Sequence, residues 1–487
     1  MVIKDLVFPE KDLFIKIFGD NVFLVGGAVR DILLTGEVKK EKDIDLMVIN
    51  ESYVSLTKKL SPFGKTNTVG KSFAVLKFSV GSITYDISIP RRDTKIDPNS
   101  NSHKNFRVES GSDISLEEDL SRRDFTCNSI AVRIRDGLIS DPFYGFDSIK
   151  KKLIKMTSPN TFADDPLRLL RAARFSSVLE FSIEDKIYEE SKKIDLSELS
   201  MERVSEEFIR MLLESVHPSI GFKEYFNLTI FKQILPEVHK MALTIQDSIF
   251  HPEKDDYDHH TVFIHTAIAL DVAKKISKIY KLSKEEELTL LLSVVLHDIG
   301  KPQTTDWEFK RGRMTVTSLY HDSIGVDIAF EILERLNIDT RNKFPVRDIV
   351  LKMVKNHHRL YDLYSNREVV GFKAFSRLLR DMEGRDDLLV YLDFSDRRSR
   401  ESTPLEFSDL DKISKWYLKK KEELNIDKET IEPLIFGRDL ISLGIEPGKE
   451  MGVFLDKLYN MQLDGKFLTK DEGLTMAKRI LSEKSGN

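Results

Sequence analysis

Apolar and polar residues follow two different spacings along this chain. Between residues 22 and 135, short β-branched runs (VFLV, DLMVI, AVLKF, ITYDISI and SIAVRI) alternate with turn residues and a few helical stretches, which is typical of strands in an α+β domain. From about residue 150 to 235 the spacing becomes helical, without a convincing strand. The pattern therefore predicts an α+β domain over residues 1–150 and a helical connector over residues 151–240.

The rest of the chain is also predicted to be helical. Residues 245–400 form long helical segments that hold most of the eleven histidines, and a polar, lysine-rich segment of helical character follows over residues 401–487. Histidines gathered in one helical domain suggest a metal site.

Composition limits the kind of protein this is. Of 487 residues, 41% are hydrophobic and 32% are charged, as in an ordinary globular protein. The single cysteine, Cys127, excludes an internal disulfide, so any metal must be held by oxygen or histidine ligands. Because no apolar run is long enough for a bilayer and the N-terminus lacks a signal-peptide core, we expect a cytoplasmic protein without a membrane partner. A net charge of -5 neither supports nor excludes a nucleic-acid partner, since binding depends on local patches.

A glycine pair lies between an apolar run and a predicted helix, in Phe23 to Asp31 (FLVGGAVRD). Gly26 and Gly27 would expose backbone amides at a helix N-terminus, where a polyphosphate can approach closely, and Arg30 adds a positive charge one turn later. A lone glycine pair is more often a plain strand-to-helix turn.

Two acidic residues start the next apolar run. Asp43 and Asp45 are two positions apart, so on a strand they face the same side and repel each other unless a cation lies between them. Mg²⁺ is the natural partner of such a pair. A third candidate is Asp86, which alternation places opposite the apolar face of ITYDISI; a solvent-facing acid explains it about equally well.

A predicted helix starts at Pro166 and carries three arginines at a spacing of three. Asp165 precedes the helix and fits an N-cap, which local sequence favours over a ligand role. Arg168, Arg171 and Arg174 share one half of the helical wheel. They would repel each other there, which suggests a bound anion, although a solvated face is the simpler alternative.

Together these motifs resemble a known family. GGAVRD followed by DID, then RRDFTCN at Arg122 to Asn128 and DPFYG at Asp141 to Gly145, is similar to CCA-adding enzymes and bacterial poly(A) polymerases, which have a polymerase-beta-like head. The resemblance implies that two Mg²⁺ ions held by Asp43 and Asp45 activate a 3′-hydroxyl and steady the leaving pyrophosphate.

The same resemblance assigns the nucleotide contacts. It implies that Gly27 and Arg30 contact the triphosphate and that Arg122 holds the nucleotide, a role that Arg123 could share. In the family an Asp and an Arg select the incoming base without a template, and the residues in those places are Asp165 and Arg168. The carboxylate accepts from the exocyclic amine of cytosine or adenine, and the guanidinium donates to the neighbouring ring acceptor. Further nucleotide or phosphate contacts are implied for Arg171 and Arg174.

A second motif lies in the histidine-rich segment. His297 and Asp298, in LHDIGKP, follow a strongly apolar stretch, which predicts that both side chains are buried. Buried polar groups need a partner. The segment resembles the metal-binding motif of HD phosphohydrolases, which implies His265 and Asp396 as the remaining ligands. His321 and His357 or His358 are in places that some members use for extra metal or phosphate contacts. A lone histidine would more often be a satisfied core or surface residue, but the ordered set favours a divalent ion, with Mn²⁺, Ni²⁺, Co²⁺ and Mg²⁺ all open.

The expected protein is therefore a polymerase-beta-like α+β head (1–150), a helical neck and body (151–240), an all-α HD domain (245–400) and a helical tail (401–487). The resemblance implies addition of CMP and AMP to a tRNA 3′ end from CTP and ATP, with no obligate protein partner evident. Within the same superfamily, a poly(A) polymerase or an A-adding enzyme remains open. Two other classes are an HD phosphohydrolase that uses the head as an RNA-binding platform and a purely structural RNA-binding protein. A purely structural RNA-binding protein would not require two sets of metal ligands.

Overall fold

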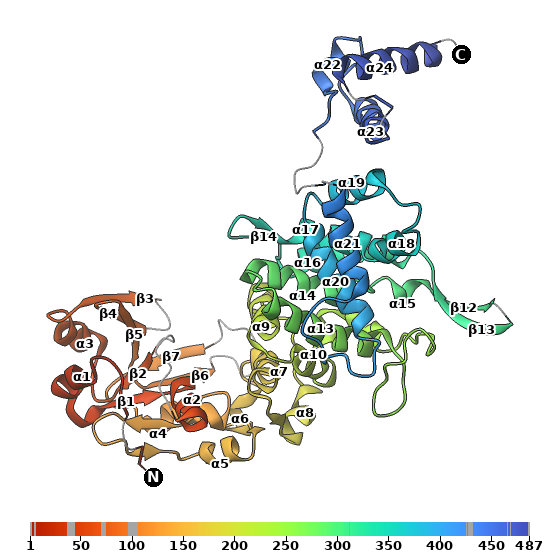
Figure 1. Ribbon diagram of the computed structural model, residues 1–487. Coiled ribbons are helices and arrows are strands. Elements are labelled where there is room, and N and C mark those ends of the chain that lie inside the picture. The colour runs from red at the N-terminus through yellow and green to blue at the C-terminus, as the bar shows by residue number, and fades with distance from the viewer. Residues whose placement is uncertain are drawn as a thin grey trace. The chain divides into compact units, whose positions relative to one another are not determined.

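The computed structural model divides into two compact units (Figure 1). The first comprises Met1–Lys240 with Arg335–Asn337, and the second comprises Met241–Glu334 with Ile338–Asn487. The predicted head and neck lie in the first unit, and the predicted HD domain and tail lie in the second. The residues that the structure describes are 2–3, 6–36, 44–69, 75–95, 106–310, 312–424, 426, 432–464, 466–467 and 469–485.

A mixed sheet forms the centre of the head. Within the described residues it has seven strands in the order β3-β4-β5-β2-β1-β8-β9, of which β2 and β5 pair in parallel and the other neighbours are antiparallel. The strands are β1 (Val22–Val25), β2 (Ile44–Val48), β3 (Lys65–Val69), β4 (Val75–Val80), β5 (Ile83–Ser88), β8 (Ala131–Arg133) and β9 (Ile139–Ser140). A separate ladder pairs β6 (Arg91–Lys95) with β7 (Phe106–Ser110). All five predicted apolar runs overlap strands of the main sheet, which confirms the α+β head.

Helices surround this sheet and continue as the neck. In the head they are α1 (Lys11–Phe18), α2 (Gly27–Thr35), α3 (Tyr53–Leu60), α4 (Leu116–Ser121) and α5 (Gly145–Lys150), with 3₁₀ turns η1 (Gly19–Asn21) and η3 (Thr126–Asn128). In the neck they are α6 (Pro159–Phe162), α7 (Leu167–Leu179), α8 (Asp185–Ser191), α9 (Met201–Glu214), α10 (Pro218–Asn227), α11 (Ile230–Ile234) and α12 (Pro236–Met241). Helix α7 packs against both α9 and α10. Two very short strands, β10 (Leu153–Ile154) and β11 (Ser182–Ile183), also pair here, where the apolar spacing predicts helices alone.

The second unit is built from packed helices. They are α13 (Val262–Ile279), α14 (Lys284–Leu296), α15 (Lys301–Thr304), α16 (His321–Arg335), α17 (Val346–Asn356), α18 (Arg359–Ser365), α19 (Phe372–Asp381), α20 (Asp386–Arg398) and α21 (Lys412–Glu423). Helix α14 packs against α13, α17 and α20, and nearly all of its side chains are buried. The tail helices α22 (Gly437–Ile441), α23 (Lys449–Leu463) and α24 (Lys470–Ser485) enclose a small core of their own around Leu440, Leu458 and Ala477. No helix in the described parts of the chain has the length and apolarity of a membrane span.

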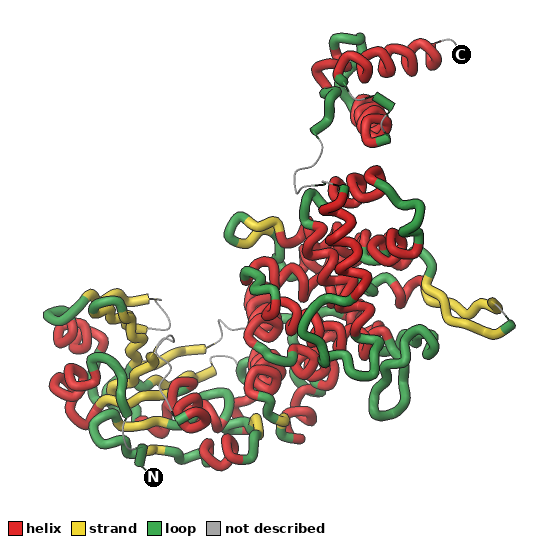
Figure 2. The backbone as a smooth tube through the Cα atoms, viewed as in Figure 1, coloured by secondary structure: helices red, strands yellow, loops and turns green. Residues whose placement is uncertain are grey.

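A β-hairpin interrupts the otherwise helical second unit (Figure 2). Strand β12 (Thr305–Lys310) pairs with β13 (Arg313–Ser318), and a minor ladder joins β14 (Thr340–Arg341) to β15 (Phe344–Pro345). The all-α expectation thus holds for the helical body but not for this insertion. Its sequence, TDWEFK and RMTVTS around Gly312, alternates with a period of two, and Gly312 supplies the left-handed turn (φ 81).

Candidate functional site

Gly26, in the glycine turn of the head, lies close to two other residues of the predicted site, Asp45 and Arg123. Gly26 has φ 70, a conformation that favours glycine. A Cβ atom on Gly26 would lie 3.1 Å from Nη1 of Arg123 and 3.8 Å from Oδ2 of Asp45. Both backbone and space therefore require glycine here, and the turn, Asp45 and Arg123 form one cluster at the start of helix α2.

Two carboxylates lie side by side on neighbouring strands of the sheet. Asp45 is exposed between the buried side chains of β2, and its register partner on the parallel strand β5 is Asp86. Residues paired in this way face the same side of a sheet. Asp86 also forms an ion pair with Lys77, at 2.8 Å. Asp43 lies outside the described residues, so its predicted pairing with Asp45 stays a prediction.

A buried acid holds the two arginines of the RRDFTCN motif. Asp119 is 0% exposed; its carboxylate accepts from Nε of Arg122 at 3.0 Å and from Nη2 of Arg123 at 3.2 Å. Burial raises the pKa of Asp119, but the two guanidinium groups outweigh it and leave that pKa below its usual range. Asp119 therefore fixes both arginines beside the glycine turn, a role that sequence reasoning missed because the acid belongs to no recognised catalytic pattern.

A chain of polar contacts links helix α2 of the head to helix α7 of the neck. Arg30 is buried and donates from Nη1 to Oδ1 of Asn128 at 2.8 Å, and from Nε to Asp31 at 3.0 Å. Asn128 in turn donates to Asp124 at 3.1 Å, and Arg171 donates from Nε to the other oxygen of Asp124 at 2.8 Å. The guanidinium of Arg30 is thus held beneath the glycine turn, and its predicted contact with a triphosphate stays a prediction.

The start of helix α7 carries the two residues expected to select the base. The carboxylate of Asp165 accepts from the backbone N–H of Leu167 at 3.2 Å and lies 3.3 Å from Nη2 of Arg203. Helix α7 begins at Leu167 rather than at the predicted Pro166, so Pro166 takes the N-cap position and Asp165 lies one residue before it. Arg168 donates from Nη2 to the backbone carbonyl of Arg122 at 2.6 Å. Burial lowers the pKa of Arg168, although that group remains charged at neutral pH. Arg168 is therefore held against the backbone of Arg122 in the head, while Asp165 contacts Arg203 of α9.

The other two arginines of α7 are neutralised by the protein itself. Arg174 is 2% exposed and donates from Nε to Glu207 at 2.6 Å, while Arg171 is paired with Asp124 and lies 3.6 Å from Glu207. The anions that the arginine spacing suggests are thus carboxylates of this chain. Burial and these contacts favour a structural role for Arg174, and its contact with nucleotide stays a prediction.

The Asp124–Arg171 pair should stabilise the first unit. Burial raises the pKa of Asp124, but Arg171 and Asn128 outweigh it and lower the pKa to about 2. Because this value is below that of an unfolded aspartate, the stabilisation is present above about pH 4 and is lost as the pH falls towards 2. We expect Asp124→Asn to lower the free energy of unfolding by about 2 kcal/mol at pH 7, measured by urea denaturation, with a smaller difference at pH 3. Equal urea midpoints at pH 7 would contradict this role.

The second unit brings all four predicted HD ligands into one cluster. His297 and Asp298 follow α14 and are each 1% exposed; His265 lies on α13 and Asp396 on α20. Nε2 of His265 is 2.9 Å from Oδ1 of Asp396, and Nε2 of His297 is 3.3 Å from Oδ2 of Asp298. Helices distant in sequence thus place two histidines and two carboxylates around one point, as a metal site requires.

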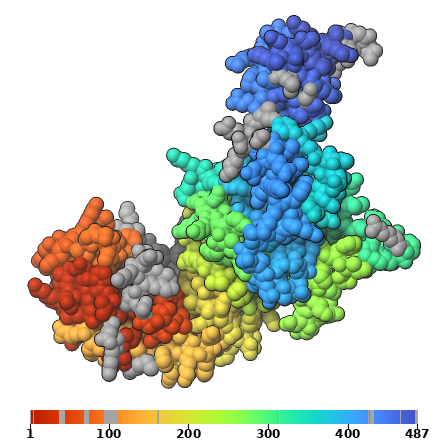
Figure 3. Space-filling view, in the orientation of Figure 1, coloured from red at the N-terminus to blue at the C-terminus, as the bar shows by residue number. Residues whose placement is uncertain are grey.

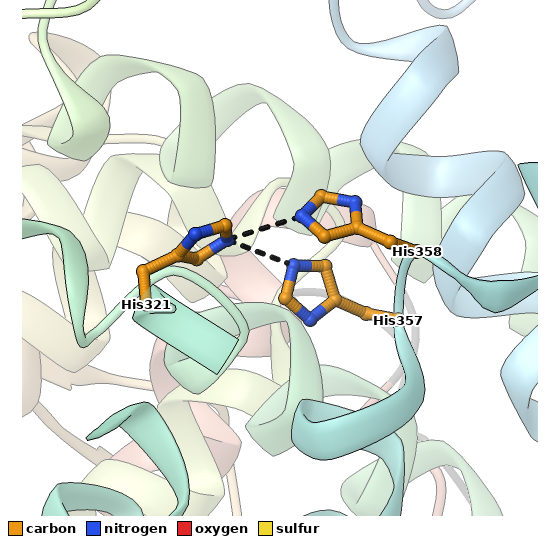
Figure 4. Close-up of side chains that lie close together, drawn as sticks. All are labelled: His321, His357 and His358. Carbon is orange, nitrogen blue, oxygen red and sulfur yellow. Dashed lines mark hydrogen bonds between the residues drawn. The ribbon is translucent and has the colours of Figure 1, made fainter. Parts of the chain in front are cut away.

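Three more histidines adjoin this cluster (Figure 4). Nε2 of His321 lies 3.2 Å from Nε2 of His357 and 3.1 Å from Nε2 of His358. Oδ1 of Asp298 is 3.3 Å from Nε2 of His321, while its other oxygen faces His265 and His297. Asp298 therefore stands between two groups of possible ligands.

Backbone contacts decide which nitrogen of these rings carries the proton. Three Nδ1 atoms lie within hydrogen-bonding distance of carbonyl oxygens, in the pairs His297 with Val294 (2.8 Å), His321 with Ser318 (2.7 Å) and His357 with Val354 (2.6 Å). A carbonyl only accepts, so Nδ1 of the neutral ring is protonated and Nε2 presents a lone pair. Facing lone pairs repel, and a cation between them removes the repulsion.

Buried polar atoms that face one another point to the same conclusion. Nε2 of His265, Nε2 of His297 and both oxygens of Asp298 are buried, and their near neighbours are the other predicted ligands and Lys301. Such atoms are costly unless a ligand satisfies them. The donor set of imidazole and carboxylate therefore fits a divalent ion.

Other charged residues surround the ligands. Glu253 accepts from Nδ1 of His265 at 2.7 Å, which turns Nε2 towards the cluster, as outer carboxylates do in metal sites. Lys301 lies 2.7 Å from Asp298, and Arg400 forms an ion pair with Asp396. Both cations thus balance carboxylates of the cluster. Sequence reasoning missed Glu253 and Arg400, because neither belongs to the HD pattern.

Comparisons with known proteins agree with this geometry. Residues 22–155 match the family described as poly A polymerase head domain, residues 180–241 match the probable RNA and SrmB-binding site of polymerase A, and residues 262–401 match the HD domain. The chain is 30% identical over 366 residues to the multifunctional CCA protein of Acinetobacter baumannii, which covers 74% of this chain and 79% of that protein. The chain belongs to the CCA-adding and poly(A) polymerase family.

Solved structures of this family share the fold. The CCA-adding enzyme of Bacillus stearothermophilus, in complex with CTP, has a TM-score of 0.59 at 18% identity and covers 99% of this chain and 100% of its own. The Thermotoga maritima CCA-adding enzyme, complexed with tRNA, has a TM-score of 0.53 at 22% identity over 98% of this chain and 97% of its own. The chain therefore shares its fold with CCA-adding enzymes.

Proposed function

We propose that this chain adds CMP and AMP to the 3′ end of tRNA, with CTP and ATP as substrates and pyrophosphate as product. The observation that carries the proposal is its relationship to a multifunctional CCA protein at 30% identity over 366 residues. The cluster of Gly26, Asp45 and Arg123, with Asp86 beside it, supplies groups suited to nucleotidyl transfer. Solved relatives in complex with CTP and with tRNA support the same substrates.

Each part of the head has a place in this reaction. Asp43 and Asp45, with Asp86 nearby, would hold Mg²⁺, which when bound would supply charge neutralisation at the triphosphate and favour ionisation of the attacking 3′-hydroxyl. The turn at Gly26 and Gly27 offers backbone amides at a helix N-terminus to the phosphates. Arg122 and Arg123, fixed by Asp119, direct positive charge towards the nucleotide.

Base selection is assigned to the start of α7. Asp165 and Arg168 are polar groups at the same helix end, and together they match the donor and acceptor edge that cytosine and adenine share. Guanine and uracil present the opposite polarity there. Selection without a template follows from these two side chains.

Removing the carboxylate of Asp165 should weaken this selection. We expect Asp165→Ala to reduce the preference for CTP and ATP over UTP and GTP by about ten- to a hundredfold, the value of one or two hydrogen bonds to a charged group. The measurement is kcat/KM for each labelled nucleotide on a tRNA lacking its last residues. Glu202→Ala, an exposed acid at the start of α9, is the matched control. An unchanged preference in Asp165→Ala would overturn the assignment.

The second unit carries a second activity. We infer that its cluster of histidines and carboxylates is a metal-dependent phosphohydrolase site that acts on phosphoester ends of RNA, with phosphate oxygens bound by Lys301 and Arg400. The histidines and carboxylates would hold a divalent ion, which when bound would supply Lewis-acid polarisation of the phosphoryl group. The support is the set of buried imidazole nitrogens and carboxylate oxygens that face one another around Asp298.

Histidines lie on both sides of Asp298, with His265 and His297 on one side and His321 on the other, and this arrangement predicts how much metal the site binds. We expect the protein, loaded with Mn²⁺ or Co²⁺ and dialysed, to retain about two ions per chain, because Asp298 has one oxygen towards each group. His321→Ala should retain about one. Metal content is measured by elemental mass spectrometry, which does not depend on activity. The same content in His321→Ala as in the unaltered protein would refute a second ion.

A further inference from the structure

The β12–β13 hairpin exposes an apolar face to solvent. Trp307 pairs with Val316, and Phe309 pairs with Met314, so these four side chains share one face of the two strands. Trp307 is 55% exposed, Phe309 71% and Met314 52%. Single exposed apolar side chains are common on protein surfaces, but several that adjoin on one face are typical of a binding surface.

The opposite, polar face of the same hairpin is the one that packs against the protein. Thr315 is buried and donates its hydroxyl to the carboxylate of Asp247. Nη1 of Arg313 lies 2.9 Å from the same carboxylate. A soluble hairpin normally buries its apolar face and exposes its polar face, and this one has the reverse arrangement. The fold therefore holds the aromatic face outward.

Both ends of the hairpin are anchored in the phosphohydrolase site. At its start, Thr305 donates to the carbonyl of Lys301 at 2.8 Å, and Nζ of Lys301 lies 2.7 Å from Asp298. At its end, the carbonyl of Ser318 accepts from Nδ1 of His321 at 2.7 Å. The hairpin projects from the helical body beyond these anchors (Figure 3). The two strands that carry the apolar face are thus connected at both ends to residues of the site.

We propose that this face, defined by Trp307, Phe309, Met314 and Val316 and called the aromatic face, is a stacking platform for unpaired terminal nucleotides of RNA. The phosphoester end of that RNA enters the site at Asp298. The proposal rests on the phosphohydrolase function proposed above and names how its substrate is held. Bases stack on aromatic side chains whatever their sequence, which suits an enzyme that meets many tRNA ends.

Charge on the hairpin also favours a nucleic acid. By strand alternation, Asp306 and Glu308 lie on the polar face, away from the aromatic face. Among the described residues of the hairpin, no carboxylate shares the aromatic face. A polyanion can therefore approach that face without repulsion from carboxylates of the hairpin on that side.

Tryptophan fluorescence tests binding without requiring hydrolysis. The chain has two tryptophans, so Trp416→Phe leaves Trp307 as the only reporter. Titration with a short single-stranded oligoribonucleotide that ends in a 3′-phosphate, in the presence of EDTA, should quench Trp307. Phe309→Ala in the same background should weaken the apparent affinity about tenfold, the value of one stacked base. Phe372→Ala, an exposed phenylalanine on α19, is the control and should leave it unchanged.

Absence of quenching, or equal affinity in Phe309→Ala, would overturn the platform. Concentration-dependent self-association that Phe309→Ala abolishes, without quenching by RNA, would assign the face to a second copy of the chain instead. Both outcomes are read by fluorescence and analytical ultracentrifugation, whatever the activity of the HD site.

Hydrolysis gives a second test. The double variant Trp307→Ala and Phe309→Ala should raise KM for an oligoribonucleotide with a 2′,3′-cyclic phosphate, so that its kcat/KM relative to bis(p-nitrophenyl) phosphate falls about tenfold. An equal loss on both substrates would show a structural role and contradict the platform. If the unaltered protein cleaves neither substrate, the proposed phosphohydrolase function fails, and the fluorescence titration still decides whether the aromatic face binds RNA.

Discussion

Asp45→Asn is expected to abolish incorporation of both CMP and AMP into tRNA. The carboxylate lies on the exposed face of β2, beside the glycine turn and in register with Asp86. In the proposed mechanism its loss removes a ligand of the ion beside the triphosphate, so we expect the rate to fall by about 10³-fold or more, or about 4 kcal/mol in activation free energy. The measurement is single-turnover incorporation of labelled CTP and of labelled ATP.

A matched variant shows that the effect is local. Asp12→Asn changes an exposed acid on α1 of the same head and should leave incorporation within about twofold. Asp45→Asn should still bind tRNA and unfold at the same urea concentration as the unaltered protein, because the side chain packs in no core. Retained incorporation in Asp45→Asn would refute its place as a catalytic metal ligand.

The second large effect is expected at the HD site. Asp298 has both oxygens buried among histidines, so Asp298→Asn removes a ligand from both groups. We expect metal-dependent hydrolysis of a 2′,3′-cyclic phosphate to fall by about 10³-fold. CMP and AMP incorporation should persist, because the nucleotidyl-transfer residues lie in the other unit.

Its control is Asp348→Asn, an exposed acid on α17, the helix that ends just before His357. Metal content measured beside activity separates ligand loss from unfolding. Hydrolysis that survives in Asp298→Asn would show that a different site, or a contaminating enzyme, is responsible. Loss of incorporation in the same variant would show that the two activities are coupled.

Local patterns predicted the parts of the fold that depend on local physics. The five apolar runs of the head became strands because their side chains are apolar and β-branched, and the sheet buries them. The helix after Asp165 was equally predictable from local sequence, although it begins one residue later than predicted and its N-cap is Pro166. The β12–β13 hairpin was not predicted, although its alternating apolar residues and Gly312 are visible in the sequence. The reason is that the segments on both sides have helical spacing, and the whole region was therefore predicted to be helical.

Contacts between residues far apart in sequence could not be predicted. The arginines of α7 suggested a bound anion, yet Arg174 is neutralised by Glu207, which is 33 positions away and on another helix. The HD ligands were found only because their order resembles a known family; their meeting depends on the packing of α13, α14 and α20. Glu253 and Asp119 act through other side chains and leave no pattern of their own.

The central claim is that this chain builds the CCA end of tRNA. The most direct test incubates the purified protein and Mg²⁺ with tRNAs that end before the first C, after one C and after two, with labelled CTP or ATP supplied separately. The account predicts CMP on the first two substrates, a single AMP on the third, and no extension beyond CCA. AMP incorporation alone, as one residue or as a growing tail, would contradict it and indicate an A-adding enzyme or a poly(A) polymerase; no incorporation at all would leave the HD site as the main activity.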